Sequence, residues 1–276
     1  MEAARTRPSA PGAALGNLRI YAMDGALLGL FMVSACLSVA LVEHSDSPLR
    51  QQLGSGFARR ALVGIAMGLT ALGLIYSPWG KRSGAFMNPA MTVCFMRLGK
   101  LEPLTTLGYV IAQFLGGTLG VAVCDSFFHA WVAHPAVNYV VTEPGEYGTL
   151  VAWLAELGIG FSMLTVVTLV NRIPRLAPSS GLFAATLVAL FITFEAPLSG
   201  MSLNPARSFA SSLIAGSFRG FWIYLTAPVA GMLLAVELQR CLGARHTRLC
   251  GKLTHSETMP CFVRCTCLDP SRSNQS

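Results

Sequence analysis

The sequence predicts an all-α membrane protein with six transmembrane helices, two re-entrant half-helices and an internal inverted repeat. Only 12% of its 276 residues are charged and 53% are hydrophobic, whereas soluble domains carry about 25% charged residues. Six apolar stretches approach or exceed the length of about 20 helical residues that crosses a bilayer. Two copies of Asn-Pro-Ala, at residues 88–90 and 204–206, stand in matching places of two apolar halves. These three observations decide the fold class.

The six apolar stretches are expected to form the spanning helices. The fifth is the shortest, and it can borrow residues from Leu176 onward to reach the required length. In three places glycines recur four residues apart, as in Gly25 and Gly29, a spacing that lets helix backbones approach closely in lipid. The stretches are Tyr21–Val42, Phe57–Tyr76, Leu104–Cys124, Leu150–Val170, Gly181–Ala196 and Phe221–Leu238.

Each Asn-Pro-Ala is expected to begin a short helix. Asn is a favoured N-cap, and Pro suits the first helical position because its missing N–H would have no partner there. A stretch containing Gly and Ser precedes each copy, and short apolar runs follow, near Pro89–Arg97 and Pro205–Ala215. A single Asn-Pro-Ala is more often an ordinary cap or turn. Two copies in matching places indicate paired discontinuous helices at a transport site near the middle of the membrane.

The distribution of Lys and Arg predicts that both termini face the cytoplasm. With the N-terminus inside, fifteen of the 20 basic residues fall in inside segments and five fall outside. The loop expected at Asp125–Gly148 has neither Lys nor Arg, as suits an outer loop, while Arg59 and Arg60 at the outer start of the second span are the exception. Six spans make the first and the fourth run in opposite directions, so the two halves form an inverted repeat.

On these residues the chain resembles the aquaporin, or major intrinsic protein, family between about Tyr21 and Leu238. The resemblance rests on both Asn-Pro-Ala boxes with their flanks, Ser83–Thr92 and Asn204–Ser208, on the run Tyr109–Gln113, and on an acid in the first and fourth spans. It implies a passive channel for water and other small neutral solutes that excludes ions and protons. It also implies a homotetramer in the cell membrane (plasma or inner membrane), with one pore per subunit.

The predicted organisation has three parts. They are a cytoplasmic N-terminal segment (1–20), an aquaporin-like channel domain (21–240, with halves of about 21–125 and 149–240) and a cytoplasmic tail that contains Cys and His (241–276).

Two opposed half-helices explain how such a pore rejects ions. Each helix N-terminus carries about half a positive charge from its aligned peptide dipoles, so the point where two of them meet repels cations and protons. The side-chain amides there are expected to donate hydrogen bonds to a passing oxygen, and carbonyl groups of the preceding loops are expected to accept them. The residues of this junction are predicted to be Asn88, Pro89, Ala90, Asn204, Pro205 and Ala206.

The expected constriction departs from both common subclasses of the family. Arg207 lies one turn after Asn204, and an arginine inside a membrane is costly and usually functional. Water-selective members typically pair an aromatic residue with His at the constriction, and glycerol-type members have aromatics and an Asp after the Arg, where this chain has Ser208. The apolar wall predicts weak discrimination, with glycerol or another small polyol as the alternative principal solute. The four filter positions are predicted to be Met67, Ile192, Met201 and Arg207.

Two acids lie inside apolar spans, Asp24 in the first and Glu156 in the fourth. A buried acid needs hydrogen-bond partners. In the family that this chain resembles, the matching acids brace the loops before the half-helices, although Asp24 is shorter than the Glu that is usual there. The alternative is a proton site in a proton-coupled carrier.

The tail suggests metal chemistry, which the resemblance does not cover. Cys250, His255, Cys261 and Cys265 have the density of a four-ligand zinc or iron site on the reducing side of the membrane. The alternative is a tail with free thiols. A third class of function is therefore a non-conducting, metal-sensing membrane protein.

Two further classes of function have no support in the sequence. No nucleophile–base pair or phosphate-binding loop predicts an enzyme, and no basic groove with interleaved aromatics predicts a nucleic-acid partner. Transport itself is expected to need no cofactor, with membrane lipid and small neutral solutes as the partners.

Overall fold

The computed structural model describes residues 11–242 and 252–253. These residues form helices and connecting loops without β-strands, and six of the helices are long and apolar enough to cross a membrane. The long helices are α1 (Pro11–Glu43), α3 (Gly56–Tyr76), α6 (Pro103–Val132), α7 (Gly148–Arg172), α8 (Ser180–Phe194) and α11 (Phe221–Cys241). The short elements are α2 (Pro48–Gln52), α4 (Pro78–Ser83), α5 (Pro89–Arg97), η1 (Asn138–Val140), η2 (Ala177–Ser179), α9 (Ala196–Ser199) and α10 (Pro205–Ala215).

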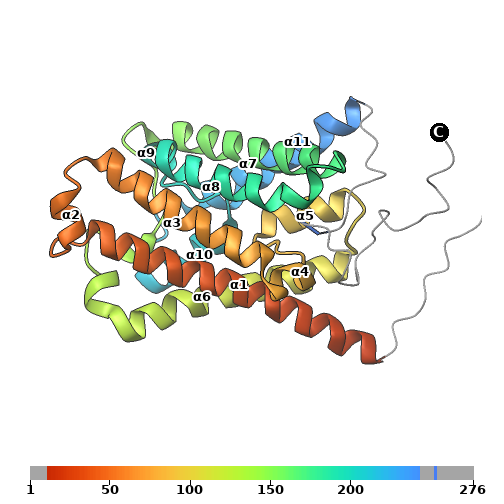
Figure 1. Ribbon diagram of the computed structural model, residues 1–276, viewed down its shortest axis with the longest axis horizontal. Coiled ribbons are helices and arrows are strands. Elements are labelled where there is room, and N and C mark those ends of the chain that lie inside the picture. Colours follow the sequence, from red (N-terminus) through yellow and green to blue (C-terminus); the bar gives the residue numbers. More distant parts are fainter. Residues whose placement is uncertain (1–10, 243–251, 254–276) are drawn as a thin grey trace, which may run out of the picture.

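The long helices run roughly along the longest axis of the molecule and enclose α5 and α10 (Figure 1). We name the end of the bundle that carries α2 the α2 end, and the end that carries Lys252 and Leu253 the tail end. From the middle of the bundle α5 runs to the tail end and α10 runs to the α2 end, so the two half-helices point away from each other. The predicted fold class, with six spans, two half-helices and an inverted repeat, is confirmed.

Glycine at the predicted spacing allows the closest helix crossings. At the crossing of α1 and α6, a Cβ atom on Gly116 would lie 2.0 Å from the carbonyl oxygen of Gly25, a distance that no real side chain tolerates. The corresponding crossing of α7 and α11 in the second half depends on Gly231 in the same way, with the carbonyl oxygen of Leu157 at 2.1 Å from a Cβ. Close backbone packing through small residues is the usual means of helix association in lipid.

Two long helices extend beyond their apolar stretches. The first begins at Pro11, inside the segment expected to precede the membrane domain. The third continues from Cys124 to Val132, so the first part of the expected loop at 125–148 is helical instead. In that extension His129 Nδ1 and Asp125 Oδ1 lie 2.7 Å apart, one turn along the helix, and the backbone of Phe128 is kinked (φ −133°). Local side-chain pairing of this kind supports a helix that hydropathy alone does not predict.

Candidate pore

The two Asn-Pro-Ala segments meet tip to tip in the middle of the bundle. Asn88 caps α5, its Oδ1 accepting from the N–H of Ala90 at 2.9 Å, and Asn204 caps α10 in the same way, its Oδ1 accepting from Ala206 at 3.0 Å. Pro occupies the first position of each helix, as the capping argument predicts.

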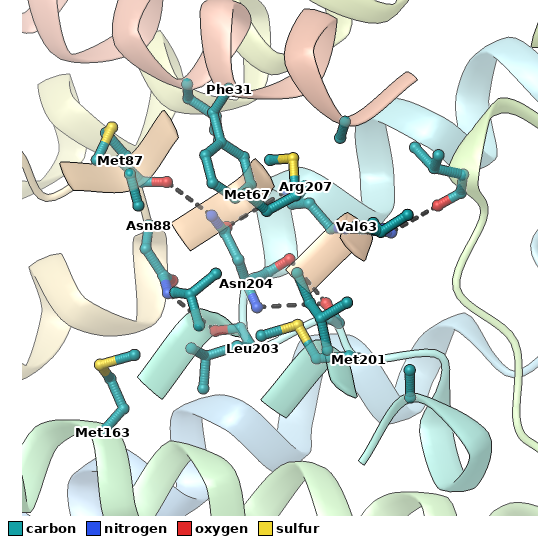
Figure 2. Close-up of a pocket in the computed structure, with 18 of the residues that line it drawn as sticks. Phe31, Val63, Met67, Met87, Asn88, Met163, Met201, Leu203, Asn204 and Arg207 are labelled. Carbon is teal, nitrogen blue, oxygen red and sulfur yellow. Dashed lines mark hydrogen bonds between the residues drawn. The ribbon is translucent and has the colours of Figure 1, made fainter. Parts of the chain in front are cut away.

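Each capping amide also reaches across to the other half. Asn88 Nδ2 donates to the carbonyl of Leu203 at 2.8 Å, and Asn204 Nδ2 donates to the carbonyl of Met87 at 2.6 Å (Figure 2). An Asn amide has two N–H donors. One donor of each therefore joins the two halves, and the other remains for a solute at the junction.

The loops that lead into the two half-helices have the same unusual backbone. Gly84, Ala85 and Met87 have left-handed φ values of 98°, 54° and 48°, and the residues at the same distances before Asn204 have φ values of 80°, 51° and 59°. Non-glycine residues adopt this region at an energetic cost, which is usually found at functional sites. The residues of the second loop are Gly200, Met201 and Leu203. The internal repeat is therefore preserved in backbone conformation as well as in helix order.

Asp24 joins the first loop and α6 through four hydrogen bonds. Its carboxylate accepts from the backbone N–H of Phe86 at 3.0 Å and of Met87 at 2.9 Å, from the hydroxyl of Ser83 at 3.1 Å and from the amide of Gln113 at 2.7 Å. Asp24 is fully buried. The shorter acid thus does reach the loop.

Glu156 holds the second loop at the corresponding atoms. Its carboxylate accepts from the backbone N–H of Ser202 at 2.5 Å and of Leu203 at 2.7 Å, and from the hydroxyl of Ser199 at 2.8 Å. Buried carboxylates with several N–H and O–H donors are well-satisfied anions. Both acids therefore act as braces that hold the loop backbones in their left-handed conformations.

A cavity of about 330 Å³ follows the junction along the bundle. Its wall takes one face of α3, at residues 60, 63, 67, 71 and 75, and one face of α8, at residues 184, 188 and 192, followed by residue 196 at the start of α9. Positions three or four apart lie on one side of a helix. The four predicted filter residues, Met67, Ile192, Met201 and Arg207, all line this cavity.

The wall near the filter positions is apolar apart from Arg207. Phe31 of α1 lies beside Asn204, and Val63 lies one turn before Met67 on the same face of α3 (Figure 2). Sequence analysis did not identify either residue. The apolar spacing of α1 and α3 signals a buried face, but it does not separate residues that face a cavity from residues that face another helix.

Arg207 is oriented by the loop between α6 and α7. Its Nη1 donates to the carbonyl of Val140 at 2.7 Å. Val140 ends η1, whose three residues all have left-handed φ values between 43° and 53°. One guanidinium N–H of Arg207 is thus bonded to a carbonyl on a left-handed segment of backbone. The guanidinium group carries four further N–H donors.

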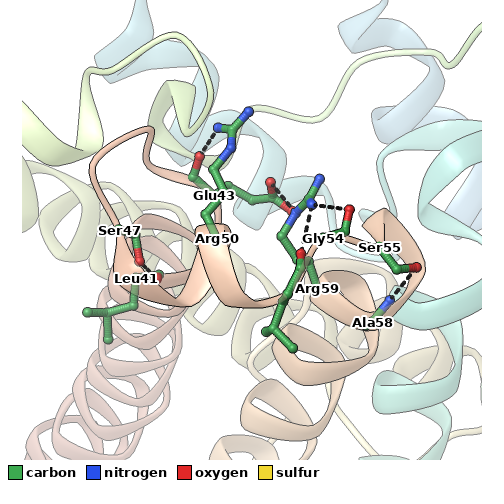
Figure 3. A network of polar contacts seen from close by, with 9 residues as sticks. Leu41, Glu43, Ser47, Arg50, Gly54, Ser55, Ala58 and Arg59 are labelled. Carbon is green, nitrogen blue, oxygen red and sulfur yellow. Dashed lines mark hydrogen bonds and ion pairs between the residues drawn. The ribbon is translucent and has the colours of Figure 1, made fainter.

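Charged side chains gather at the α2 end of the cavity. Glu43 and Arg60 both line it, and Arg60 Nε donates to the carbonyl of Thr193 at 3.4 Å. Arg59 Nε lies 2.9 Å from Glu43 Oε2, and Arg59 Nη1 donates to the carbonyl of Leu53 at 3.1 Å (Figure 3). The two arginines that stood against the expected charge distribution are therefore used at the mouth of the cavity. No pattern in the sequence indicates the pairing of Arg59 with Glu43.

The four residues proposed to bind metal, Cys250, His255, Cys261 and Cys265, lie outside the described residues. Within residues 11–242 and 252–253, no group of three or more His, Cys, Asp or Glu side chains is placed to hold a metal ion.

Two half-helices that enter a six-helix bundle from opposite ends and meet at capping amides define a membrane protein of the channel class. Residues 23–238 match the Major intrinsic protein family, and the chain belongs to this family.

Named relatives and a solved structure support the same assignment. The chain is 35% identical over 222 residues to aquaporin NIP3-1 of Arabidopsis thaliana, covering 78% of this chain and 65% of the plant protein. It is 35% identical to aquaporin NIP2-2 of Zea mays, covering 73% of this chain and 64% of that protein. The match thus spans less than two thirds of the length of these relatives. The X-ray structure of the aquaglyceroporin from Plasmodium falciparum has the same fold, with a TM-score of 0.64 at 20% identity over 81% of this chain and 95% of that chain.

Proposed function

We propose that the protein is a passive channel for water and small neutral solutes that excludes ions and protons. The observation that carries the proposal is the junction, where two helix N-termini face each other and each capping amide keeps one donor free. A neutral solute exchanges water partners for these donors, whereas a cation meets two positive helix ends. A passive channel is neither an enzyme nor a metal sensor that does not conduct, so this proposal is an alternative to both of those classes of function.

The test is the osmotic shrinkage of proteoliposomes in a stopped-flow instrument, with water, glycerol, urea and ammonia compared. Water permeability well above that of empty liposomes, without proton or cation conductance, is the expected result. Dependence of the flux on a pH gradient would support a proton-coupled carrier that uses Asp24 or Glu156 instead. The braced geometry of both acids supports the channel, because their carboxylates are already occupied by the loops.

We infer that Met67, Ile192, Met201 and Arg207 form the filter. Because the first three are apolar, we expect the filter to discriminate weakly between solutes. An unmet hydrogen bond in an apolar setting costs about 1–3 kcal/mol. Water then passes more slowly than through a polar filter of equal width. Glycerol-like solutes have an apolar flank, so they leave fewer hydrogen bonds unmet in this filter. The likeness in fold to an aquaglyceroporin does not decide between the two solutes.

Replacing Ile192 tests this filter. Ile192→His adds a hydrogen-bonding side chain to the cavity that Arg207 also lines, so we expect the ratio of water to glycerol permeability to rise. Ile192→Leu is the matched control, because it keeps the apolar wall. Fast water flux with complete exclusion of glycerol in the unmodified protein would contradict this assignment of the filter.

We further propose that the tail end faces the cytoplasm, that the protein resides in the cell membrane, and that it assembles as a homotetramer. The excess of Lys and Arg in segments at the tail end supports the orientation, and the family resemblance supports the tetramer. Protease access to the tail in vesicles of known sidedness tests the first, and the mass of the protein–detergent complex tests the last.

We also propose that Cys250, His255, Cys261 and Cys265 bind zinc or iron. Metal analysis of protein purified without chelators should find about one ion per chain, as a four-ligand site requires, and truncation after Leu242 should remove it. A metal-free preparation would rule the site out.

A further inference from the structure

A residue from the C-terminal segment lines the cavity at its tail end. Leu253 lines the cavity together with Ile75, Ala85 and Ala184. Its side chain is 5% exposed and packs in the same buried cluster as these residues. Leu253 lies well beyond the last helix in sequence, since α11 ends at Cys241 and the described residues resume at Lys252 after Leu242.

Both backbone groups of Leu253 are bonded to the channel wall. Its N–H donates to the carbonyl of Gly84 at 3.1 Å. Its carbonyl accepts from Asn171 Nδ2 at 3.2 Å and from the hydroxyl of Ser180. These partners belong to three different elements, which are the first lead-in loop, the end of α7 and the start of α8. The wall therefore holds the residue as it would hold an extended peptide ligand.

Lys252 adds a second anchor. Its side chain is fully buried and its Nζ donates to the carbonyl of Lys81 in α4 at 2.8 Å. A Cβ atom on Gly84 would lie 3.5 Å from Lys252 Cγ, so the aliphatic stem packs directly on the lead-in loop. Burying an ammonium group costs free energy unless it is hydrogen-bonded, and the carbonyl of Lys81 supplies such a bond.

The position of the two residues bears directly on passage. A solute that leaves Asn88 toward the tail end meets the Leu253 side chain, which offers no hydrogen bond. The carbonyl of Gly84, on the lead-in loop, is already used by the Leu253 N–H. The segment thus occupies the carbonyl of Gly84 on the lead-in loop and places an apolar side chain in the wall of the cavity.

We propose that Lys252 and Leu253 are a tethered plug, which binds the tail end of the cavity and closes it to solutes. The proposal rests on the channel function proposed above. The structure represents the closed form, and release of the segment opens the pore. Gly84, Asn171, Ser180 and Lys81 form the binding site that recognises the segment.

Two truncations separate the plug from the rest of the tail. Truncation after Leu242 removes the plug, and truncation after Thr254 keeps it while removing His255, Cys261 and Cys265. In proteoliposomes, truncation after Leu242 should raise water permeability at least about threefold, as expected if most molecules are closed at rest. Truncation after Thr254 should match the full chain, and Leu253→Ala in the full chain should give an intermediate value. Equal permeability of the full chain and the truncation after Leu242, both above empty liposomes, would overturn the proposal.

A binding measurement keeps the plug testable without flux. A fluorescent peptide of residues 248–257, with Cys250→Ser to prevent oxidation, should bind saturably to the protein truncated after Leu242 in detergent. The same peptide with Leu253→Asp should not bind, because it would bury a charge in the apolar site. If no version of the protein conducts, the proposed channel function is wrong, and the binding site for the segment is then tested by the peptides alone. Binding of the parent peptide without binding of the Leu253→Asp peptide supports the site. Failure of the parent peptide to bind overturns it.

Discussion

The two lead-in loops of the pore have the same architecture and different attachments. Both have left-handed backbone at the same three places, and both are held by a buried acid through two N–H groups and one serine hydroxyl. At the tail end Lys252 and Leu253 lie on the first loop. At the α2 end the backbone of Thr142 and Glu143 lies on the second loop, and a Cβ on Gly200 would be 3.1 Å from the nitrogen of Glu143.

This difference separates the shared scaffold from what makes the two ends unequal. The braces, caps and loop conformations occur twice, so they serve the scaffold. Arg207 with its Val140 carbonyl occurs only in the second half, and the contact with Leu253 occurs only in the first. The selection proposed at one end and the closure proposed at the other are thus additions to a symmetric frame.

The largest expected effect comes from the cross-bonds at the junction. In Asn88→Asp and Asn204→Asp the new carboxylate still caps the helix, because Asp is a good N-cap. It places an oxygen against the carbonyl of Leu203 or Met87, where a donor is needed, and adds negative charge. We expect each variant to lose at least about tenfold in water flux or to admit cations, since a lost donor and a new charge together exceed about 1.4 kcal/mol.

The symmetry of the junction makes the two variants controls for each other, measured by stopped-flow shrinkage and by cation conductance. Equal losses of water flux in the two variants indicate that both halves contribute equally to the junction. Unchanged water and cation permeability in both variants would contradict the role of the junction.

The acids test whether the two braces are equivalent. Asp24→Asn and Glu156→Gln keep the shape but leave an amide N–H facing loop N–H donors. Hydrogen bonds to a charged acceptor contribute about 1.5–3 kcal/mol each, so thermal unfolding in detergent should shift down by several degrees for each. We expect similar shifts, because both acids hold two backbone N–H groups. A large shift in one half and none in the other would show that one loop holds its conformation without its acid.

The smallest effect concerns Glu195, which has no acidic counterpart in the first half. It follows the span Ala177–Phe194, is 8% exposed, and has both of its carboxylate oxygens buried. Burial, with a smaller contribution from the Glu156 carboxylate, raises the pKa of Glu195 from 4.5 to about 8. Between these pH values the folded protein holds a proton that the unfolded chain has lost, so this group lowers stability as pH rises from about 4.5 to 8.

Glu195→Gln removes that dependence. The variant should match the parent protein near pH 5 and exceed its unfolding temperature at pH 9 by at least about 3 °C, equivalent to about 1 kcal/mol for a chain of this size. Parallel stability profiles from pH 5 to 9 would mean that Glu195 is ionised in the folded protein.

The scaffold was predictable from the sequence because local rules produce it. Asn at the N-cap and Pro at the first helical position favour a helix start, and α5 and α10 begin and end where expected. The extension of α6 past Asp125 was not predictable from hydropathy, because it depends on a local pair with His129.

The attachments were not predictable, because they join residues far apart in the chain. Leu253 bonds to Gly84 in the first half of the chain and to Ser180 in the second, and nothing in its own sequence context is periodic or capped. The reach of Asp24 likewise depends on how closely α1 approaches the first loop. Sequence spacing within one element indicates faces and caps, and distances between elements follow only from packing.

The crossed amides have a consequence for ancestry. Neither half of the chain can complete its own junction, because Asn88 needs a carbonyl of the second loop and Asn204 needs one of the first. A single-half precursor with one Asn-Pro-Ala would form the same hydrogen bonds only as a pair of copies inserted in opposite directions. The Asn amide of each copy would then donate to the loop of the other across a two-fold axis. In this protein one chain carries both halves, so the opposed orientations that such a pair would need are held within a single molecule.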